Sequence, residues 1–175
     1  MKNNLVILCL NKNYSKSIGK QLADSLELFF VDLNDILEYN LINNNMLQNS
    51  GLEYYQKERQ KAIRGITTYE NSLVCGSIDL FFENDNIVKF KQNFVILYLQ
   101  LKKDDLQKLN AQDSLQNSKN LIAFEQEDVA CQSVANLTVK VGLQNSKDNL
   151  KLIKNALISY FGGKNGYWWK MCKRT

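Results

Sequence analysis

The residues whose types and spacing best suit a chemical role lie between Leu5 and Ala23. There an apolar run is followed by a polar segment and then by a helical pattern. The run Leu5–Leu10 is unbroken by polar residues, which is typical of a strand buried on both faces of a parallel sheet. Asn11–Ser15 is polar, and from Lys16 onward the apolar residues recur at helical spacing. Strand, short loop and helix form the frame in which backbone N–H groups bind the phosphates of a nucleotide.

That frame lacks the side chains that phosphate binding needs. The phosphate loop has the pattern G-x-x-x-x-G-K-[ST]. Counted along the strand, its two glycines fall on Cys9 and Tyr14, and its lysine and hydroxyl residue fall on Ser15 and Lys16 in turn. Lys12 and Lys16 could still offer positive charge to an anion, but Tyr14 cannot bring its backbone as close as glycine. A solvated basic loop is favoured, and nucleotide binding is the alternative. The candidate residues of this degenerate phosphate loop are Lys12, Ser15, Lys16 and Ser17.

Acidic and amide residues follow the second apolar run, Leu28–Val31. Oxygen atoms of Asp32, Asn34 and Asp35 could together hold Mg²⁺. A cluster that caps a helix over Leu33–Asn40 explains the same residues, with Asn34 as the capping residue. We favour the cap and expect no metal site; if a metal binds, Asp32 is its ligand.

Composition excludes several classes of protein. The chain has 175 residues, is 45% hydrophobic and 23% charged, and suits one globular domain. It has no histidine, which excludes histidine-based acid–base catalysis and histidine metal ligands. The net charge of +4 is too small to indicate a nucleic-acid partner by itself. The cysteines are isolated, and no apolar stretch is long enough for a membrane span or a signal peptide, so we expect a cytoplasmic protein.

The elements that must position these residues alternate between strand and helix, which predicts an α/β fold with a mostly parallel sheet. Apolar runs predict five strands, near Leu5–Leu10, Leu28–Val31, Leu73–Cys75, Phe94–Leu99 and Leu137–Val141. Helical patterns after the first helix cover Leu33–Asn40, Leu52–Ile66, Asn84–Lys91, Lys102–Leu109, Ala123–Ala135 and Ser146–Phe161. Asn43–Ser50 indicates an asparagine-rich connection.

A basic, aromatic tail follows the last predicted helix. Gly162 and Gly163 end that helix, so we expect one domain over residues 1–161 and a tail over 162–175. The tail could stack on nucleic-acid bases, lie at a membrane surface or bind a pocket in a partner protein. Alternatively, its tryptophans pack on their own domain. The candidate partner-binding residues are Tyr167, Trp168, Trp169 and Lys170.

The order of segments resembles that of shikimate kinase, a small P-loop kinase, from about Asn4 to Phe161. LVILCLNKNYSKSIGKQLADSL follows the family's strand, phosphate loop and helix without a gap. FFVDLNDILE is similar to F-[IV]-D-x-D-x-x-I-E, GLEYYQKERQKAI to G-E-x-x-F-R-x-x-E, and VANLTVKV to V-A-D-x-T-V. The resemblance implies a three-layer α/β sandwich around a five-stranded parallel sheet, with a lid over the active site and with ATP and Mg²⁺ as cofactors.

The family's functional residues carry over at few positions. Asp32 matches the acid that lies near the magnesium in the family, whereas the acid that contacts the substrate's hydroxyls is Asn34 here. The arginine that binds the substrate carboxylate is replaced by Gln56, and the acid three residues later by Arg59. The second substrate-binding arginine aligns with Glu127, which turns attraction into repulsion.

The glycine triplet and the lid depart from the family as well. LVCGSIDL places Gly76, Ser77 and Ile78 at the triplet, where a bulky Ile78 would intrude on a substrate. The lid between Leu109 and Phe124 is short and has no arginine. A single transition-state arginine contributes about 10³–10⁵ in the rate of phosphoryl transfer. Phosphorylation of shikimate is therefore not expected.

Three functional hypotheses follow. The first is a non-catalytic, shikimate-kinase-like protein that needs no cofactor and acts through a protein partner, self-association or regulation. The second is a divergent ATP-dependent small-molecule kinase that retains ATP and Mg²⁺. The third is a nucleic-acid-associated protein that uses the basic aromatic tail.

Overall fold

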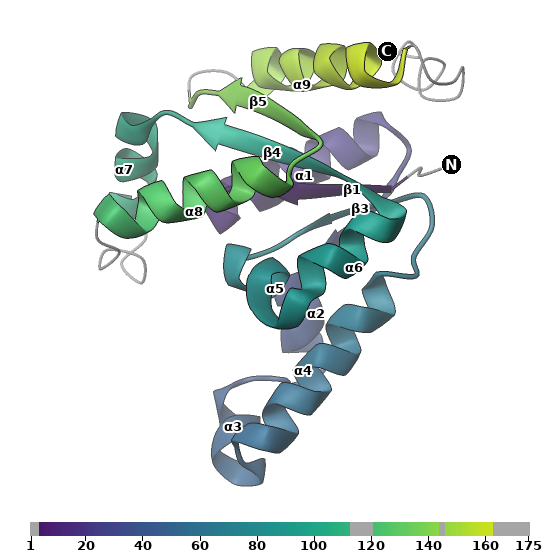
Figure 1. The fold of residues 1–175 in the computed structure, drawn as a ribbon, viewed down its shortest axis with the longest axis vertical. Coiled ribbons are helices and arrows are strands. Elements are labelled where there is room, and N and C mark those ends of the chain that lie inside the picture. The colour runs from purple at the N-terminus through teal and green to yellow at the C-terminus, as the bar shows by residue number, and fades with distance from the viewer. Residues whose placement is uncertain (1–3, 113–120, 144–145, 163–175) are drawn as a thin grey trace.

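Five parallel strands form one sheet in the order β2-β3-β1-β4-β5 (Figure 1). The computed structural model describes residues 4–112, 121–143 and 146–162. The strands are β1 (Asn4–Leu8), β2 (Phe29–Asp32), β3 (Ser72–Cys75), β4 (Phe94–Leu101) and β5 (Leu137–Val141). All neighbouring pairs are parallel, and β1 and β4 pair from Asn4 with Phe94 to Leu8 with Tyr98. The predicted parallel sheet and α/β fold are confirmed, with strand bounds that differ by one or two residues.

Helices cover both faces of this sheet. They are α1 (Lys12–Ser25), α2 (Leu33–Tyr39), α3 (Asn44–Ser50), α4 (Leu52–Ile66), α5 (Ile78–Phe82), α6 (Asn86–Asn93), α7 (Lys103–Gln112), α8 (Leu121–Val134) and α9 (Ser146–Phe161). Leu5 and Ile7 of β1 pack with apolar residues of α1 and α9, whereas Val6 and Leu8 pack with those of α4, α6 and α8. Successive side chains of a buried strand thus supply two cores, and the chain forms three layers.

Helices α3 and α4 extend away from the sheet at one end of the molecule (Figure 1). The sequence indicated a connection over Asn43–Ser50, and that prediction was wrong because Asn43 is a helix cap. Its side-chain oxygen accepts hydrogen bonds from the backbone N–H groups of Asn45 and Met46, at 3.0 and 3.3 Å. Two further differences concern α5, which was not predicted, and α6, which starts at Asn86 rather than Asn84.

The three cysteines that the structure describes are buried and unpaired, as predicted. Burial raises the pKa of the Cys9 thiol to about 12, and burial raises those of Cys75 and Cys131 too, so these thiols are protonated near neutral pH. Cys172 lies outside the described residues. Within the described part of the chain, no helix is long and apolar enough to cross a membrane.

Candidate functional site

The helix after β1 begins earlier than the sequence indicated. Helix α1 starts at Lys12, and the side-chain oxygen of its N-cap, Asn11, accepts a hydrogen bond from the Tyr14 backbone N–H at 2.8 Å. The Ser15 backbone N–H donates to the Asn11 carbonyl at 3.0 Å. The predicted loop over Asn11–Ser15 was therefore wrong, because asparagine is a strong N-cap. The N–H groups of Tyr14 and Ser15 already have partners within the helix and its cap.

The four candidate phosphate-loop residues on α1 differ in their exposure to solvent. Ser15 is fully buried. Lys12 is half-buried, whereas Lys16 and Ser17 are exposed. Since Ser15 stands at the lysine position of the phosphate-loop pattern, no cation reaches from that position toward a phosphate.

Tyr14, at the second glycine position, is built into the fold. Its hydroxyl donates to the Gly142 carbonyl at 3.3 Å and accepts a hydrogen bond from Asn149 Nδ2 at 3.0 Å. Burial raises the pKa of Tyr14 to about 12, so the phenol stays protonated near neutral pH. Tyr14 therefore links the start of α1 to the connection between β5 and α9.

Lys16, at the hydroxyl position of the pattern, reaches the acidic residues that follow β2. Its Nζ lies 3.5 Å from Asp32 Oδ2 and 2.5 and 2.7 Å from the two carboxylate oxygens of Asp35. The hydrogen bond to Asp35 raises the pKa of Lys16. Asp32 is almost fully buried, and it also accepts a hydrogen bond from the Asn34 backbone N–H at 2.8 Å. Asp32 is thus the cap of α2, and the prediction of Asn34 as that cap was wrong.

This cluster does not fit Mg²⁺. In P-loop enzymes a Ser or Thr hydroxyl at this position and an aspartate hold the metal. Here the side chain at that position is an ammonium, which donates hydrogen bonds and has no lone pair for a metal. It lies beside the two carboxylates that a cation would use, so Mg²⁺ would meet a like charge from Lys16.

Asn34 and the residues at the glycine-triplet position hold two connections together. Asn34 Nδ2 donates to Ser77 Oγ, and the Ser77 backbone N–H donates to Asn34 Oδ1, both at 2.8 Å. A Cβ on Gly76 would lie 3.0 Å from the Leu33 Cβ, a tight contact that glycine avoids. Ile78 begins α5 and packs against the core on that side of the sheet.

The α4 position that the resemblance assigns to the substrate carboxylate is occupied by Gln56, which carries no charge. Gln56 is exposed, and Arg59, one turn later, is held by acidic residues of the next segments. Its guanidinium lies 3.0 Å from both Asp79 and Glu83 and donates to the Tyr55 hydroxyl at 3.1 Å. Arg59 therefore ties α4 to α5, and its charge is already compensated.

Glu127 lies partly buried on α8, next to a carboxylate that holds the helix on the sheet. Asp128 accepts hydrogen bonds from the Tyr98 hydroxyl at 2.5 Å, from Gln100 Nε2 at 3.1 Å and from Gln132 Nε2 at 2.6 Å. The structure thus joins Lys16 with Asp32, and Asn34 with Ser77 beside Gly76. Gln56 and Glu127 stand on separate helices. The tail candidates Tyr167, Trp168, Trp169 and Lys170 lie outside the described residues.

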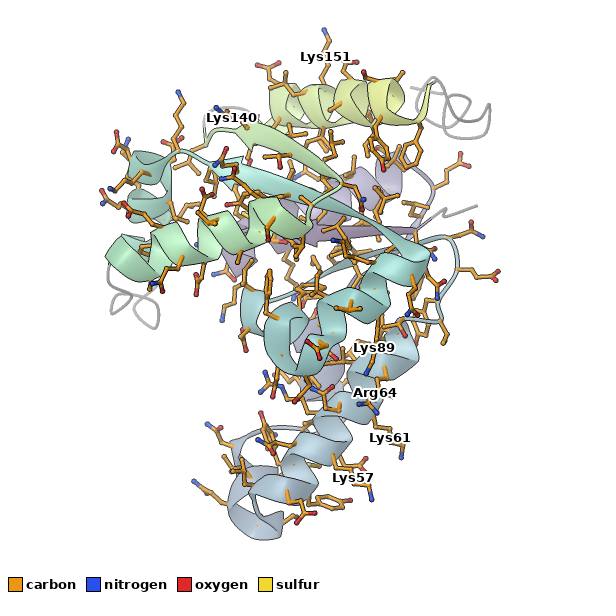
Figure 2. The ribbon with its side chains drawn as sticks, viewed as in Figure 1. Lys57, Lys61, Arg64, Lys89, Lys140 and Lys151 are labelled. Atoms are coloured by element: carbon orange, nitrogen blue, oxygen red, sulfur yellow. The ribbon has the colours of Figure 1, made fainter. Side chains whose placement is uncertain are left out.

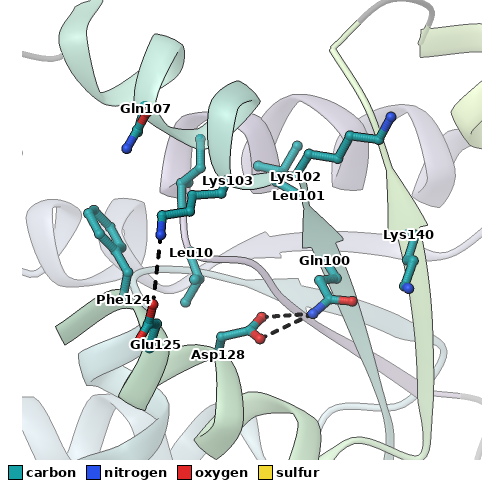
Figure 3. A pocket seen from close by; sticks show the side chains of 11 residues that line it. Leu10, Gln100, Leu101, Lys102, Lys103, Gln107, Phe124, Glu125, Asp128 and Lys140 are labelled. Atoms are coloured by element: carbon teal, nitrogen blue, oxygen red, sulfur yellow. Dashed lines mark hydrogen bonds and ion pairs between the residues drawn. The ribbon is translucent and has the colours of Figure 1, made fainter. Parts of the chain in front are cut away.

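A cavity of about 440 Å³, which sequence reasoning missed, lies where β1 and β4 end (Figure 3). Leu10, Leu106 and Phe124 give it apolar walls, and Lys102 and Lys140 also line it. The chain runs from β1 toward one edge of the sheet and from β4 toward the other, and ligands of open α/β sheets bind at such a switch point. The sequence could have pointed to this cavity only through the carboxyl ends of the predicted strands, where ligands of parallel sheets bind.

Comparison with known proteins gives a match to a family model and matches to solved structures. A family model described as shikimate kinase matches residues 16–157. No curated protein matches the chain. Shikimate kinase from Bacteroides thetaiotaomicron has a similar structure, with a TM-score of 0.70 at 13% identity over 87% of this chain and 96% of that one. Shikimate kinase from Aquifex aeolicus has a TM-score of 0.65 at 16% identity, over 91% of this chain and 97% of that one. Shikimate kinase from Acinetobacter baumannii, in complex with shikimate, has a TM-score of 0.67 at 18% identity, over 92% of this chain and 94% of that one.

Proposed function

Because the chain belongs to the shikimate kinase family, we propose that it is a non-catalytic member that acts through protein binding, self-association or regulation. The observation that carries this proposal is the position of Lys16, whose ammonium lies between Asp32 and Asp35. Phosphoryl transfer depends on Mg²⁺ and on cations that surround the transferred group. In this chain the carboxylates near the metal position are compensated by an internal cation.

Two further observations support the loss of catalysis. The backbone N–H groups of Tyr14 and Ser15 are engaged by Asn11, so they are not available to cradle phosphates. Gln56 and Glu127 stand where the family has arginines for the substrate carboxylate. Nucleotide, metal and substrate binding are thus each impaired by a different residue.

A coupled assay with ATP, Mg²⁺ and shikimate tests the proposal, together with calorimetric titration of ATP–Mg²⁺. We expect no turnover above background and no saturable nucleotide binding. Restoring the loop with Tyr14→Gly and Ser15→Lys should not give activity, because the substrate arginines remain absent. Turnover by the natural chain that Asp32→Ala abolishes would overturn the proposal.

A divergent kinase is the second candidate, and the cavity at the ends of β1 and β4 favours it. Lys102 and Lys140 line this cavity and could hold phosphate groups beside an apolar wall. Phosphotransfer from ATP to a panel of hydroxylated small acids tests this candidate. Activity that Lys102→Ala and Lys140→Ala reduce would favour it over the non-catalytic proposal.

The tail over 162–175 belongs to the proposal as the partner-binding segment, with Trp168 and Trp169 as anchors. A cytoplasmic location is proposed with it. Association with nucleic acid through the same tail is the competing interpretation, and it differs in its salt dependence.

A further inference from the structure

Four cations stand in a line on α4 and α6, away from the residues that the sequence analysis singled out for phosphate chemistry. Lys57, Lys61 and Arg64 are exposed and share one face of α4, and Lys89 of α6 continues the line (Figure 2). We call these four residues the basic stripe. Of these four residues, only Lys61 has a carboxylate of a described residue within 4.0 Å, that of Glu58 at 3.7 Å. The stripe therefore presents largely uncompensated positive charge.

A shallow hollow of about 580 Å³ opens beside this stripe. Three carboxamides line it, from Gln56, Gln60 and Asn84, together with the three stripe residues of α4. Gln60 is only 9% exposed, and neither its Oε1 nor its Nε2 has a hydrogen-bond partner among the described residues. Both amide atoms are out of contact with solvent, so Gln60 reaches a ligand by turning its amide toward the hollow. A buried carboxamide without partners is costly, so a ligand that supplies both a donor and an acceptor would favour that turn.

We propose that the hollow and the basic stripe bind an extended, acidic peptide segment of a partner protein. The three carboxamides each offer one donor group and one acceptor, which match the N–H and C=O groups of a peptide backbone. Lys57 and Lys61 are about 6 Å apart along the helix axis. Alternate side chains of an extended peptide are about 6.6 Å apart, so acidic residues at every second position face successive cations.

The lining favours a peptide over a nucleic acid. Single-stranded nucleic acids bind basic grooves that also carry aromatic side chains, on which the bases stack. The residues that line this hollow are carboxamides and cations, with no aromatic ring among them. The surface uses no member of the Lys16–Asp32–Asp35 cluster, so the inference goes beyond the proposed function and would stand if the chain proved to be a kinase.

Fluorescence anisotropy of the full-length protein with labelled ten-residue peptides tests the proposal. The probe alternates Glu and Ser; a second peptide carries the same residues as two blocks, and a third replaces Glu by Gln. A ten-nucleotide single strand of DNA is the fourth probe. We expect saturable binding of the alternating peptide, weaker binding of the block peptide and none of the neutral one.

Variants then locate the site. Lys61→Ala combined with Arg64→Ala should weaken the alternating peptide about tenfold, whereas the charge-matched pair Lys20→Ala and Lys151→Ala should not. Gln60→Leu should weaken binding, because it removes a carboxamide that would bind the peptide backbone. It should not lower the melting temperature, because the polar atoms that it removes are buried and lack partners. Equal loss in both double variants, no binding of any peptide, or tighter binding of the DNA would each overturn the proposal.

Discussion

At the residue scale, Lys16 places a positive charge beside the two carboxylates that follow β2, those of Asp32 and Asp35. Asp32 is buried to 7% exposure, and a carboxylate at that depth needs a counter-charge or donors. The backbone N–H of Asn34 and the ammonium of Lys16 supply both. The Lys16 ammonium thus gives the buried Asp32 carboxylate a counter-charge from within the chain.

Removing that ammonium should open the cluster to a divalent ion. We expect Lys16→Ser to lower the unfolding free energy by about 1 kcal/mol, since Asp32 and Asp35 lose their shared cation. For a chain of this size that is a fall of about 2–4 °C in melting temperature. Millimolar Mg²⁺ or Ca²⁺ should restore part of it, in Lys16→Ser but not in the natural protein or in Lys20→Ser. A variant as stable as the natural protein and indifferent to metal would contradict this account.

Tyr14 makes the protein sensitive to alkali. Its pKa is raised to about 12 in the folded chain, above the usual value of 10.0, so folding favours the protonated phenol. The resulting stability is fully present below about pH 10 and is lost as the pH rises toward 12. We expect Tyr14→Phe to cost about 1 kcal/mol at pH 7, through the lost hydrogen bonds to Gly142 and Asn149.

Urea unfolding at pH 7 and pH 11 measures this effect. The difference in unfolding free energy between Tyr14→Phe and the natural protein should shrink at the higher pH, because the phenol then contributes less. The buried thiols are common to both proteins, so their own contributions cancel in the difference, apart from the interaction between Cys9 and Tyr14, which also raises the pKa of Tyr14. A difference that grows with pH would refute the assignment.

At the scale of elements, the cap of α1 decides whether a phosphate loop can form. Asn11→Ala should destabilise the protein by about 1 kcal/mol, because the Tyr14 N–H loses its acceptor. Ser17→Ala, on the exposed face of the same helix, is the control and should be neutral. Thermal unfolding of the two variants measures the contrast, and equal melting temperatures would argue against a capping role.

The strands could be predicted from sequence because a run of apolar residues buried on two faces is a strong local signal. The inner strands β1, β3 and β4 are such runs, whereas the edge strands β2 and β5 are only partly buried and were predicted from shorter apolar patterns. The short helices α3 and α5 have seven and five residues, too few for a 3.6-residue period to stand out. The start of α1 was misplaced because a phosphate-loop frame suggested a loop, although Asn11 is a favourable cap.

The candidate site was only partly readable for a similar reason. Alignment with a motif named Lys16, Asp32 and Asn34, but their pairing depends on where α1, β2 and β3 end in space. Gln60 carried no motif, and its unpaired amide is evident only when α4 is packed against its neighbours. The residue types of the site could therefore be predicted from the sequence, whereas their contacts with one another depend on how the helices pack.

For the whole molecule, the parallel order β2-β3-β1-β4-β5 brings the ends of β1 and β4 together at the switch point of the sheet. The cavity there could not be predicted, because its walls come from α7 and α8 as well as from the strands. The basic stripe on α4 and α6 is a second surface, built from residues that no strand end positions. The two surfaces let binding of a small ligand and of a partner be tested separately.

The tail after α9 lies beyond the part of the chain that the family model matches. Its part in association can be tested separately from that of the basic stripe. If Trp168 and Trp169 anchor a partner, deleting 162–175 should leave the melting temperature unchanged and abolish co-purification of that partner. If they pack on their own domain, the deletion should lower the melting temperature and leave the partners unchanged.

Aromatic anchoring should persist at high salt, whereas a basic contact alone should weaken steeply. Pull-downs at low and high salt, with Lys61→Ala and Arg64→Ala in the full chain for comparison, separate the tail from the basic stripe. An identical set of partners for the full and shortened chains would exclude the tail as the anchor.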